Sequence, residues 1–442
     1  MSKTFRPWDV DQVWLLPPSV QDFVPAKHVA HFVRETVRTA LDLRAILACY
    51  GEERGYPPYH PTMMVALLLY GYSRGVYSSR QLERACEERV DFMAVTGMSK
   101  PDFRTIAEFR RRHLAALGDL FVQVLKLCRE AGLVKLGHVA LDGTKIKANA
   151  SKHKAMSYGR MREAEAKLAA EVQAWFARAA AADAEEDRAH GTARGDELPD
   201  WVADKQQRLA RLRQAKAALE AEAKAPPAAD NDGPGPSTGM MDHGKPKRAP
   251  DGGPPPRAQR NFTDPDSRIQ KTRDGMIQGY NAQIAVDGAH QIIVAQRVQT
   301  SSADRGALVP LVTAIRRDIE DKPKELSADA GYCDEANLAF LARRRIAAYL
   351  APGRARHGGG DPAGKRQPRK GSRVAAMATK LRRAGRRSRY RLRKQIVEPV
   401  FGQIKAARAF RQFFLRGLDP VRREWAMICA AHNLLKLAKA TG

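Results

Sequence analysis

The stretch VKLGHVALDGTKIKANAS, residues 134–151, decides how the rest of this 442-residue chain is interpreted. Its apolar and polar residues alternate and then give way to a turn, a pattern that predicts a β-strand. The strand carries Asp142 near its end. KELSADAGY, residues 324–332, predicts a second, short strand that ends at Asp329. Two strands that each end in an aspartate indicate that acidic side chains gather at one edge of a sheet.

The residues after Arg260 predict the remainder of a domain with both strands and helices. GYNAQIAVDG and QIIVAQRVQTS are expected to form a hairpin that turns at Asp287–Gly288. RKQIVEPVFGQIKAARAF, residues 393–410, is expected to be helical with Pro399 in its first turn, where proline is tolerated. The other predicted elements are helices at about 304–319, 335–344 and 419–440 and a strand in AAYLAP.

Residues 1–130 are expected to be mostly helical. The predicted helices span about 29–48, open at His60–Pro61, follow a cap at Ser78–Ser79, and run from a cap at Thr105 to Gly132. Several of them carry Arg-rich faces. Such helices are typical of a helix-turn-helix-like DNA reader and equally of an ordinary helical domain with a charged surface. Composition favours neither interpretation.

Two segments interrupt this pattern of strands and helices. Residues 156–187 and 199–224 predict two amphipathic helices that pair as an antiparallel hairpin, and 225–257 is rich in Pro, Gly and Asp, as in a disordered linker. Residues 351–394 hold 16 Lys or Arg against one acid, Asp361. We expect this block to be mobile in the free protein and to bind phosphate, the alternative being a solvated basic loop without a partner.

The charge of the whole chain favours a polyanionic partner. Lys and Arg number 76 against 49 Asp and Glu, a formal net charge of +27. Basic side chains gain affinity for nucleic acid by releasing counterions from phosphates, although a merely solvated surface is the alternative. The five cysteines are scattered without CxxC spacing, which argues against zinc or disulfides and fits a reducing cytosol. No apolar stretch is long enough to predict a membrane span.

Three acids stand out by position: Asp142, Asp329 and Glu398, the last on the predicted helix around VEPVFGQIK. Carboxylates from two strand ends and one helix can converge, and together they would repel unless a cation neutralised them. Oxygen ligands suit Mg²⁺ or Mn²⁺, and two such ions can drive displacement at phosphorus. A single Asp–Gly is in most proteins a turn, so the hypothesis depends on all three acids together.

The motifs LDGTKIKANAS, FTDPDSR, GYNAQIAVD, ADAGY and VEPVFGQIK resemble those of the DDE transposases of bacterial insertion sequences. HPTMMVALLLYGYSRGVYSSRQLE and PDFRTIAEFR are similar to the helical domain that precedes the catalytic domain in one branch of that group. The resemblance covers roughly residues 5–155, 258–350 and 388–440, with the motifs in the family's order.

The resemblance implies an Asp–Asp–Glu triad of Asp142, Asp329 and Glu398 on two Mg²⁺ ions, for which Mn²⁺ would substitute. Many relatives also carry a Tyr and an Arg before the Glu and a Lys seven residues after it. Lys405 matches that Lys. Lys394 stands at the Arg position, whereas Tyr390 and Arg393 come one residue early. These four residues are the expected DNA contacts.

Other polar residues have weaker claims. Tyr280, Asn281 and Gln283 in GYNAQ either act directly or only shape a strand. The remaining candidates have structural interpretations: Asp264 and Asp266 as turn residues, Asp334 as the cap of the 335–344 helix, and His153 and His290 as surface residues.

The predicted architecture is α+β: a helical N-terminal domain, then a ribonuclease-H-like mixed β-sheet flanked by helices, with a helical-hairpin insertion. The expected parts are a DNA-binding domain at 1–132, the catalytic domain at 133–154 and 258–442, the insertion and linker at 155–257, and a basic loop at 351–389.

The expected activity is metal-dependent cleavage at element ends followed by strand transfer into target DNA. The alternatives are a nuclease that cuts without joining and a catalytically silent DNA-binding derivative. By resemblance we expect a homodimer on DNA, in the bacterial cytoplasm at the nucleoid, with no membrane partner. No nucleotide cofactor is expected, because phosphodiester bonds are exchanged.

Overall fold

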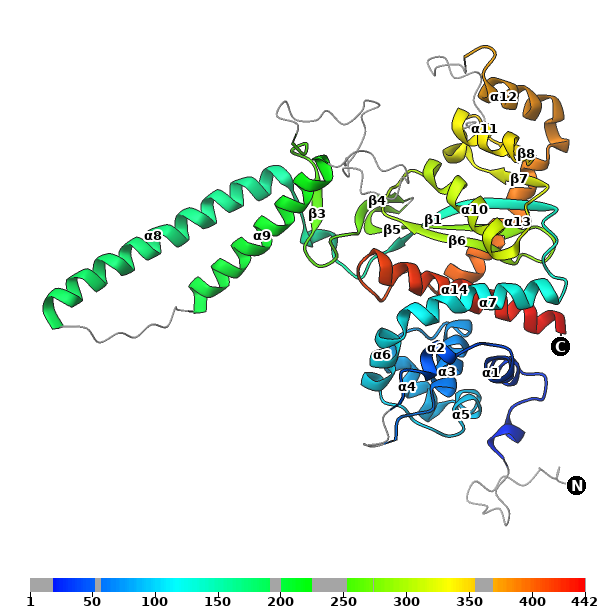
Figure 1. Ribbon diagram of the computed structural model, residues 1–442, viewed down its shortest axis with the longest axis horizontal. Helices are drawn as coiled ribbons and strands as arrows, with labels where there is room; N and C mark the ends of the chain where they lie inside the picture. The colour runs from blue at the N-terminus through cyan, green and yellow to red at the C-terminus, as the bar shows by residue number, and fades with distance from the viewer. Residues whose placement is uncertain are drawn as a thin grey trace, which may run out of the picture. The chain divides into compact units, whose positions relative to one another are not determined.

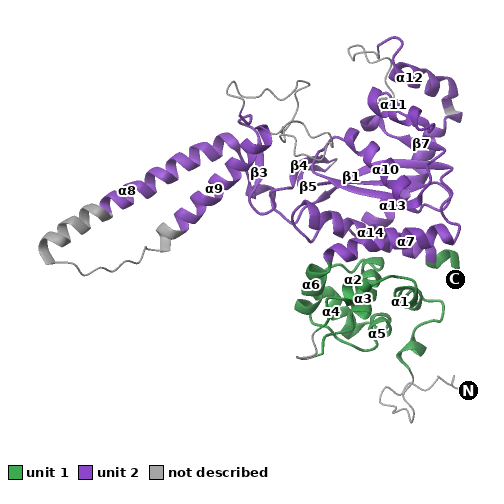
Figure 2. Cartoon of the chain, in the orientation of Figure 1, with its two compact units in different colours: residues 1–113, 438–442 green, residues 114–437 purple. Residues whose placement is uncertain are grey.

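The computed structural model describes residues 19–51, 57–190, 200–224, 253–272, 274–353 and 369–441. The chain forms two compact units (Figure 2): unit 1 comprises Met1–His113 with Ala438–Gly442, and unit 2 comprises Leu114–Leu437. Each unit is described by itself. Among the described residues no helix combines the length and apolar character that crossing a membrane requires.

Unit 1 is helical. Its elements are η1 (Val20–Phe23), α1 (Val29–Thr39), α2 (Arg44–Leu47), α3 (Pro61–Ser73), α4 (Ser79–Glu88), α5 (Val90–Thr96) and α6 (Phe103–Arg112). Helix α3 is buried on almost all sides, because MMVALLLY leaves no polar face, and α1 and α5 pack on it. The predicted starts at His60 and Ser78 are confirmed, since each side chain accepts a hydrogen bond from the first turn of its helix.

Two predicted helices of this region were each too long. The 29–48 helix divides into α1 and α2 around Asp42. The helix expected from Thr105 to Gly132 divides at His113 into α6 and α7 (Leu114–Glu130). Thr105 does not cap α6: Asp102 does, because its carboxylate accepts the backbone N–H groups of Arg104 and Thr105.

Unit 2 is built on a six-stranded mixed sheet with the order β4-β5-β1-β7-β8, and β6 also pairs with β5. The strands are β1 (His138–Lys147), β4 (Arg268–Thr272), β5 (Gly275–Asp287), β6 (Ile293–Gln299), β7 (Glu325–Ala328) and β8 (Ala347–Leu350). β1 is antiparallel to β5 and parallel to β7, which is parallel to β8. The predicted hairpin of β5 and β6 is confirmed.

Helices flank this sheet (Figure 1), and the predicted α+β fold class, consistent with a ribonuclease-H-like domain, is confirmed. Helix α10 packs on β6, and α13 packs on β1 and β5. The helices and short turns of this part are η3 (Arg305–Ala307), α10 (Leu308–Ile319), η4 (Ala330–Tyr332), α11 (Glu335–Arg343), α12 (Arg373–Ala384), α13 (Leu392–Gly402), a π-helical turn (Gln403–Ala407) and α14 (Leu418–Thr441).

The insertion is the predicted antiparallel hairpin, formed by α8 (Tyr158–His190) and α9 (Asp200–Lys224) and closed at its base by strands β2 (Ala155–Ser157) and β3 (Gln259–Asn261) (Figure 1). Ion pairs join Glu165 to Lys216 and Glu171 to Lys205, so one helix ascends as the other descends. Of the predicted linker 225–257, residues 225–252 lie outside the described residues.

Two expectations near the C-terminal end were wrong. The predicted basic loop 351–389 contains helix α12, whose Met377 is buried, and residues 354–368 lie outside the described part. Pro399 is inside α13 and not in its first turn, because the helix begins earlier, at Leu392. The Gln395 carbonyl, which loses its helical partner at Pro399, accepts instead from the Gln291 side chain at 3.1 Å.

Candidate active site

Asp142 and Asp329 lie side by side because of the register of β1 and β7. In this parallel pair Leu141 is opposite Ala328, and each aspartate is the next residue of its chain. β7 ends at Ala328, one residue before the predicted end, and Asp329 turns the chain by accepting the Gly331 N–H at 2.8 Å. The sheet therefore brings together two acids that are 187 residues apart in the sequence (329 − 142).

Asp142 carries a largely buried carboxyl group, with 18% of its side chain exposed. Burial raises its pKa to about 6, against the opposing effect of the Arg393 guanidinium, and the carboxylates of Asp329 and Asp304 raise it as well. The Gly143 N–H donates to Asp142 Oδ1 at 2.8 Å, and Arg393 donates to Oδ2 at 2.7 Å. An acid this costly to ionise is well suited to a second positive charge.

Arg393 links Asp142 to the third acid. Its other terminal nitrogen lies 4.0 Å from Glu398 Oε1, and both residues belong to α13. The Arg393 side chain is 14% exposed and that of Glu398 is 52% exposed. The structure thus connects Glu398 to Asp142 through Arg393, which stands one residue before the position of the family's arginine.

The carboxyl groups at this site are of the kind that a divalent cation binds. Among the described residues, no three carboxylate, imidazole or thiol groups converge as a ready-made metal site. The chemistry of the donors nevertheless fits, because a buried carboxyl with a raised pKa has two more carboxylates nearby. Arg393 supplies the positive charge to Asp142 in this structure.

The other predicted DNA contacts divide into two kinds. Lys405, in the π-helical turn, donates to the Oγ1 atom of Thr144 at 2.9 Å, two residues after Asp142 on β1. The Arg393 guanidinium stands over the Tyr390 ring, 5.8 Å from its centre. Lys394 is exposed, and no contact between it and the three acids occurs within the described residues.

Strand β1 presents two different faces at this site. Side chains alternate along a strand, so those of Asp142 and Thr144 share one side, with Arg393 and Lys405 of the α13 region against them; we call this the acid face. Gly143 and its neighbours Asn281 and Gln283 on β5 share the other side, together with Asp304 and Tyr332; we call this the amide face.

Sequence reasoning missed Asp304. It precedes a predicted helix, where an aspartate usually caps, but its side chain makes no capping bond. Asp304 Oδ1 instead accepts from Asn281 and Gln283, each at 2.7 Å, and Lys145 lies 3.6 Å away. The only signal in the sequence was the GYNAQ motif, whose amides needed an unidentified partner.

Two other aspartates have structural roles beyond the turns predicted for them. The Gly417 N–H donates to Asp264 Oδ1 at 3.1 Å and the Leu418 N–H to Asp266 Oδ2 at 2.8 Å, so both acids hold the start of α14. Tyr280 also donates to Asp264, at 2.7 Å. Asp334 caps α11 by accepting the Asn337 N–H, as predicted. The remaining histidine candidates, His153 and His290, are exposed, as predicted.

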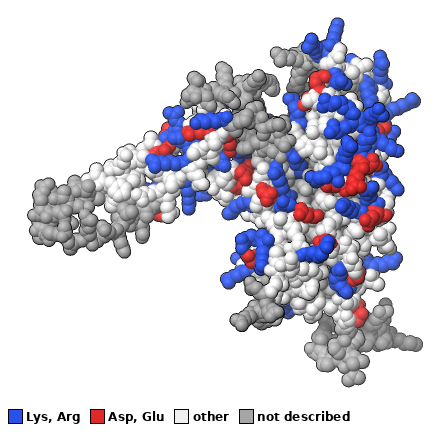
Figure 3. Space-filling model, in the orientation of Figure 1, with Lys and Arg blue, Asp and Glu red and all other residues white. Residues whose placement is uncertain are grey.

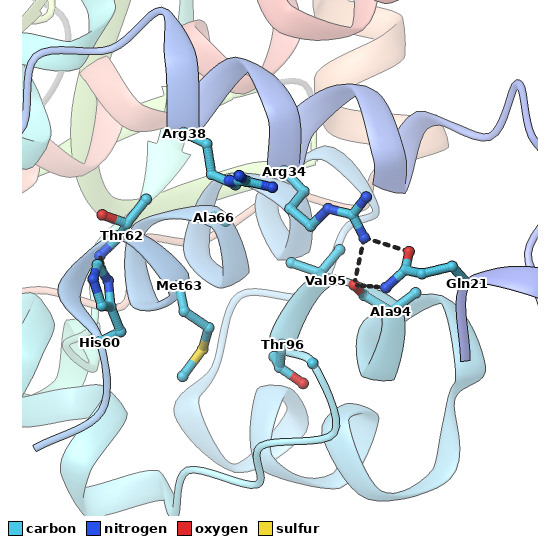
Figure 4. A pocket seen from close by; sticks show the side chains of 11 residues that line it. Gln21, Arg34, Arg38, His60, Thr62, Met63, Ala66, Ala94, Val95 and Thr96 are labelled. Atoms are coloured by element: carbon cyan, nitrogen blue, oxygen red, sulfur yellow. Dashed lines mark hydrogen bonds between the residues drawn. The ribbon is translucent and has the colours of Figure 1, made fainter. Parts of the chain in front are cut away.

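A pocket in unit 1 is separate from this chemistry. It has a volume of about 390 Å³ and contains Arg34, Arg38 and Thr96 but no acid in its lining (Figure 4). Arg34 donates to the Gln21 side chain and to the Ala94 carbonyl. The pocket therefore offers no metal ligands of the kind found at Asp142.

Basic side chains gather at one end of unit 2. Figure 3 shows Lys and Arg concentrated over α11, α12 and the start of α13, with acids between them. The exposed basic residues of this surface include Arg343, Arg373, Lys380, Arg382, Arg383, Arg387, Arg389, Arg391 and Lys394. Their charge is of the sign that attracts phosphate.

Two family models match the chain. A transposase domain (DUF772) matches residues 18–112, and a transposase DDE domain matches residues 252–434. The chain belongs to the DDE transposases of insertion sequences. No curated protein and no solved structure matched it. Transposases act on DNA, so DNA is the partner of this transposase, and DDE domains generally use divalent metals.

The DDE match contains Asp329 and Glu398 but begins after Asp142. Asp142 precedes the α8–α9 hairpin in the transposase sequence, and only the pairing of β1 with β7 brings it back to Asp329. The hairpin therefore lies in the sequence between Asp142 and the region that the DDE model matches. Asp142 and Asp329 are nevertheless neighbours in the folded structure.

Proposed function

We propose that this transposase cleaves DNA at the ends of its element and joins the freed 3′-hydroxyl to target DNA, with Asp142, Asp329 and Glu398 as the catalytic acids. The observation that carries the proposal is the adjacency of Asp142, in the middle of β1, and Asp329, directly after the end of the parallel strand β7, with Glu398 linked to Asp142 through Arg393.

The three acids are the groups that would hold divalent cations, Mg²⁺ or Mn²⁺. The resemblance to the family implies two such ions. Bound there, the cations would supply activation of the attacking oxygen and neutralisation of charge at phosphorus. Asp142 contributes a buried carboxylate that gains more from a cation than an exposed one would. Arg393, which pairs with Asp142, would also be able to bind a DNA phosphate, and Lys405 would orient the DNA backbone beside Thr144.

The remaining parts are proposed to bind DNA. Unit 1 carries the match to the transposase domain that precedes the DDE domain, and we assign it to recognition of the element ends. The basic surface of α12 and the start of α13 would contact the backbone of one of the DNA segments. Two copies of the chain would pair two ends, the arrangement that the resemblance implied.

The test is a cleavage and strand-transfer assay on the element's own ends with a labelled 3′-hydroxyl strand and Mn²⁺. Asp142→Asn is expected to abolish both products while leaving DNA binding intact. Asp334→Asn is the matched control: the residue is also an acid close to Asp329 in sequence, and asparagine caps α11 equally well.

Each alternative has its own signature in that assay. Cleaved ends without joined product would identify a nuclease that does not transfer strands. Binding without cleavage by the wild-type protein would identify a catalytically silent derivative. Full activity of Asp142→Asn would show that the acids have been assigned wrongly.

A further inference from the structure

Gly143, next to Asp142, leaves no room for a side chain, because polar side chains of β5 lie directly against it. It has no positive φ, so its backbone conformation does not require glycine. A Cβ atom at this position would overlap the Gln283 amide, with Gln283 Cδ only 2.7 Å away and Asn281 Oδ1 at 3.0 Å. The Asp–Gly pair that suggests a turn in the sequence therefore lies within β1, and its glycine admits the side chain of Gln283 from β5.

Gln283 is fully buried and its side-chain amide is fully engaged. Nε2 donates to Asn281 Oδ1 at 2.9 Å and to Asp304 Oδ1 at 2.7 Å. Oε1 accepts the hydroxyl of Tyr332. A primary amide has two N–H donors, so no donor is left over, and the group has one orientation only.

The partners of Gln283 belong to the segments that carry the two aspartates. Tyr332 is fully buried and stands in the turn that starts at Asp329, where its N–H donates to the Asp329 carbonyl at 3.3 Å. Asp304 lies against the same turn, because a Cβ at Gly331 would be 2.9 Å from Asp304 Oδ2 and 3.0 Å from Asp329 Oδ1. On its other side the Gln283 amide lies against Gly143, beside Asp142.

We propose that Gln283 is a positioning residue that fixes Asp142 and Asp329 relative to each other. Its amide packs against the glycine after the first acid and binds the tyrosine and aspartate that flank the second. It touches neither acid itself, so it acts through Gly143, Tyr332 and Asp304. This inference rests on the proposed function, because it concerns the same pair of acids.

Gln278 provides a matched comparison on the same strand. It is also buried and uses its amide to donate to Ser267 Oγ, at 2.7 Å. Its contact lies on the β4 side, away from both acid-bearing segments. A glutamine that merely fills a buried position of β5 would behave like Gln278 when it is replaced.

The experiment compares Gln283→Leu with Gln278→Leu in the full-length protein. Gln283→Leu removes three buried hydrogen bonds and Gln278→Leu removes one, so both variants are expected to unfold at lower temperature, Gln283→Leu by the larger amount. Only Gln283→Leu is expected to lose single-turnover cleavage, by about 10²-fold, the scale of a misplacement near 1 Å, with DNA affinity unchanged. Mn²⁺ binding, followed by electron paramagnetic resonance, is expected to weaken in Gln283→Leu and to stay unchanged in Gln278→Leu.

Tyr332→Phe is the second variant, which removes one hydroxyl and keeps the ring. It is expected to slow cleavage in the same sense, and the double variant Gln283→Leu/Tyr332→Phe is expected to be no slower than Gln283→Leu alone. If Gln283→Leu does not fold, Tyr332→Phe alone decides: slowed cleavage with weaker Mn²⁺ binding supports the proposal, and wild-type behaviour overturns it.

Equal cleavage rates and equal Mn²⁺ affinities in Gln283→Leu and Gln278→Leu would overturn the positioning role while the wild-type activity stood. A wild-type protein that does not cleave would overturn the proposed function instead. The Mn²⁺ titration would still decide the role of Gln283 in that case, because it needs no DNA.

Discussion

The acid face and the amide face of β1 are built from neighbouring residues and have opposite physical character. On the acid face, Asp142 is largely buried, its pKa is raised, and Arg393 is its ion-pair partner. On the amide face, Asn281, Gln283 and Tyr332 are fully buried and hydrogen-bonded to one another or to Asp304. The acid face therefore carries a carboxyl group that is costly to ionise, whereas the polar groups of the amide face have hydrogen-bond partners.

The comparison shows which of the two faces lowers the stability of the fold and which one supports it. A carboxyl group that is costly to ionise is the expected mark of a site that binds a cation, since only a further positive charge relieves it. A satisfied amide network is the expected mark of a framework, because each member has one geometry. Replacing Asp142 and replacing a member of the amide network should therefore have opposite effects on stability, although both should reduce activity.

The largest effect is expected on the acid face. Glu398→Gln removes a charge from α13 and should lower single-turnover cleavage by about 10³-fold or more, the scale for one member of a catalytic unit. Because the Glu398 side chain is half exposed, the melting temperature should hardly change. Cleavage and thermal unfolding are measured on the same preparation. A Glu398→Gln variant that cleaves at the wild-type rate would remove Glu398 from the acid face.

The second prediction concerns stability and pH, without metal. The pKa of Asp142 is about 6 in the folded protein, above its ordinary value of 3.8, so ionisation opposes folding. Stability from the protonated group is complete below pH 3.8 and is lost as the pH rises through about 6. Asp142→Asn should be more stable than the wild type at pH 8, by roughly 2–3 kcal/mol at most.

Thermal unfolding at pH 8 and at pH 4 measures this difference, which should vanish at pH 4. Gln283→Leu is the control from the amide face and should be less stable than the wild type at both pH values. If Asp142→Asn were the less stable protein at pH 8, the two faces would not differ in the way described.

A smaller effect is expected from the lysines of α13 and the turn after it. Lys405→Ala removes the ammonium group beside Thr144 and should slow cleavage by about 10-fold, the lower end of the scale for one hydrogen bond to a charged group. Lys394→Ala, exposed on the same stretch of chain, should only weaken DNA binding and reduce the salt slope by about 1. Equal effects of the two substitutions on cleavage would remove Lys405 from the acid face.

The acid face could be predicted from the sequence because its signals are local. Asp142 and Asp329 follow apolar stretches typical of strands, and Glu398 lies on a recognisable helix. The expected strand end near Asp142 was wrong, because β1 continues to Lys147. Arg393 was expected to contact DNA, one residue away from the family spacing, but its ion pair with Asp142 could not be predicted because only the fold joins the two residues.

The amide face could not be predicted because its contacts join distant segments. Gln283 meets Tyr332 across 49 residues, and Asp304 has the sequence signature of a helix cap that its side chain does not form. Pro399 was also predicted wrongly, because it lies inside α13 and not in its first turn. The Gln395 carbonyl, for which Pro399 offers no N–H, accepts a hydrogen bond from the Gln291 side chain instead. Local pattern predicted the elements, whereas tertiary pairing determined what their polar side chains bind.

The most direct test of the central claim is the number of Mn²⁺ ions bound to the protein with its end DNA, compared between the wild type, Asp142→Asn and Asp334→Asn. We predict that the wild type and Asp334→Asn bind Mn²⁺ equally and that Asp142→Asn loses it. Unchanged Mn²⁺ binding by Asp142→Asn would contradict the assignment of Asp142, Asp329 and Glu398 as one cation-binding site.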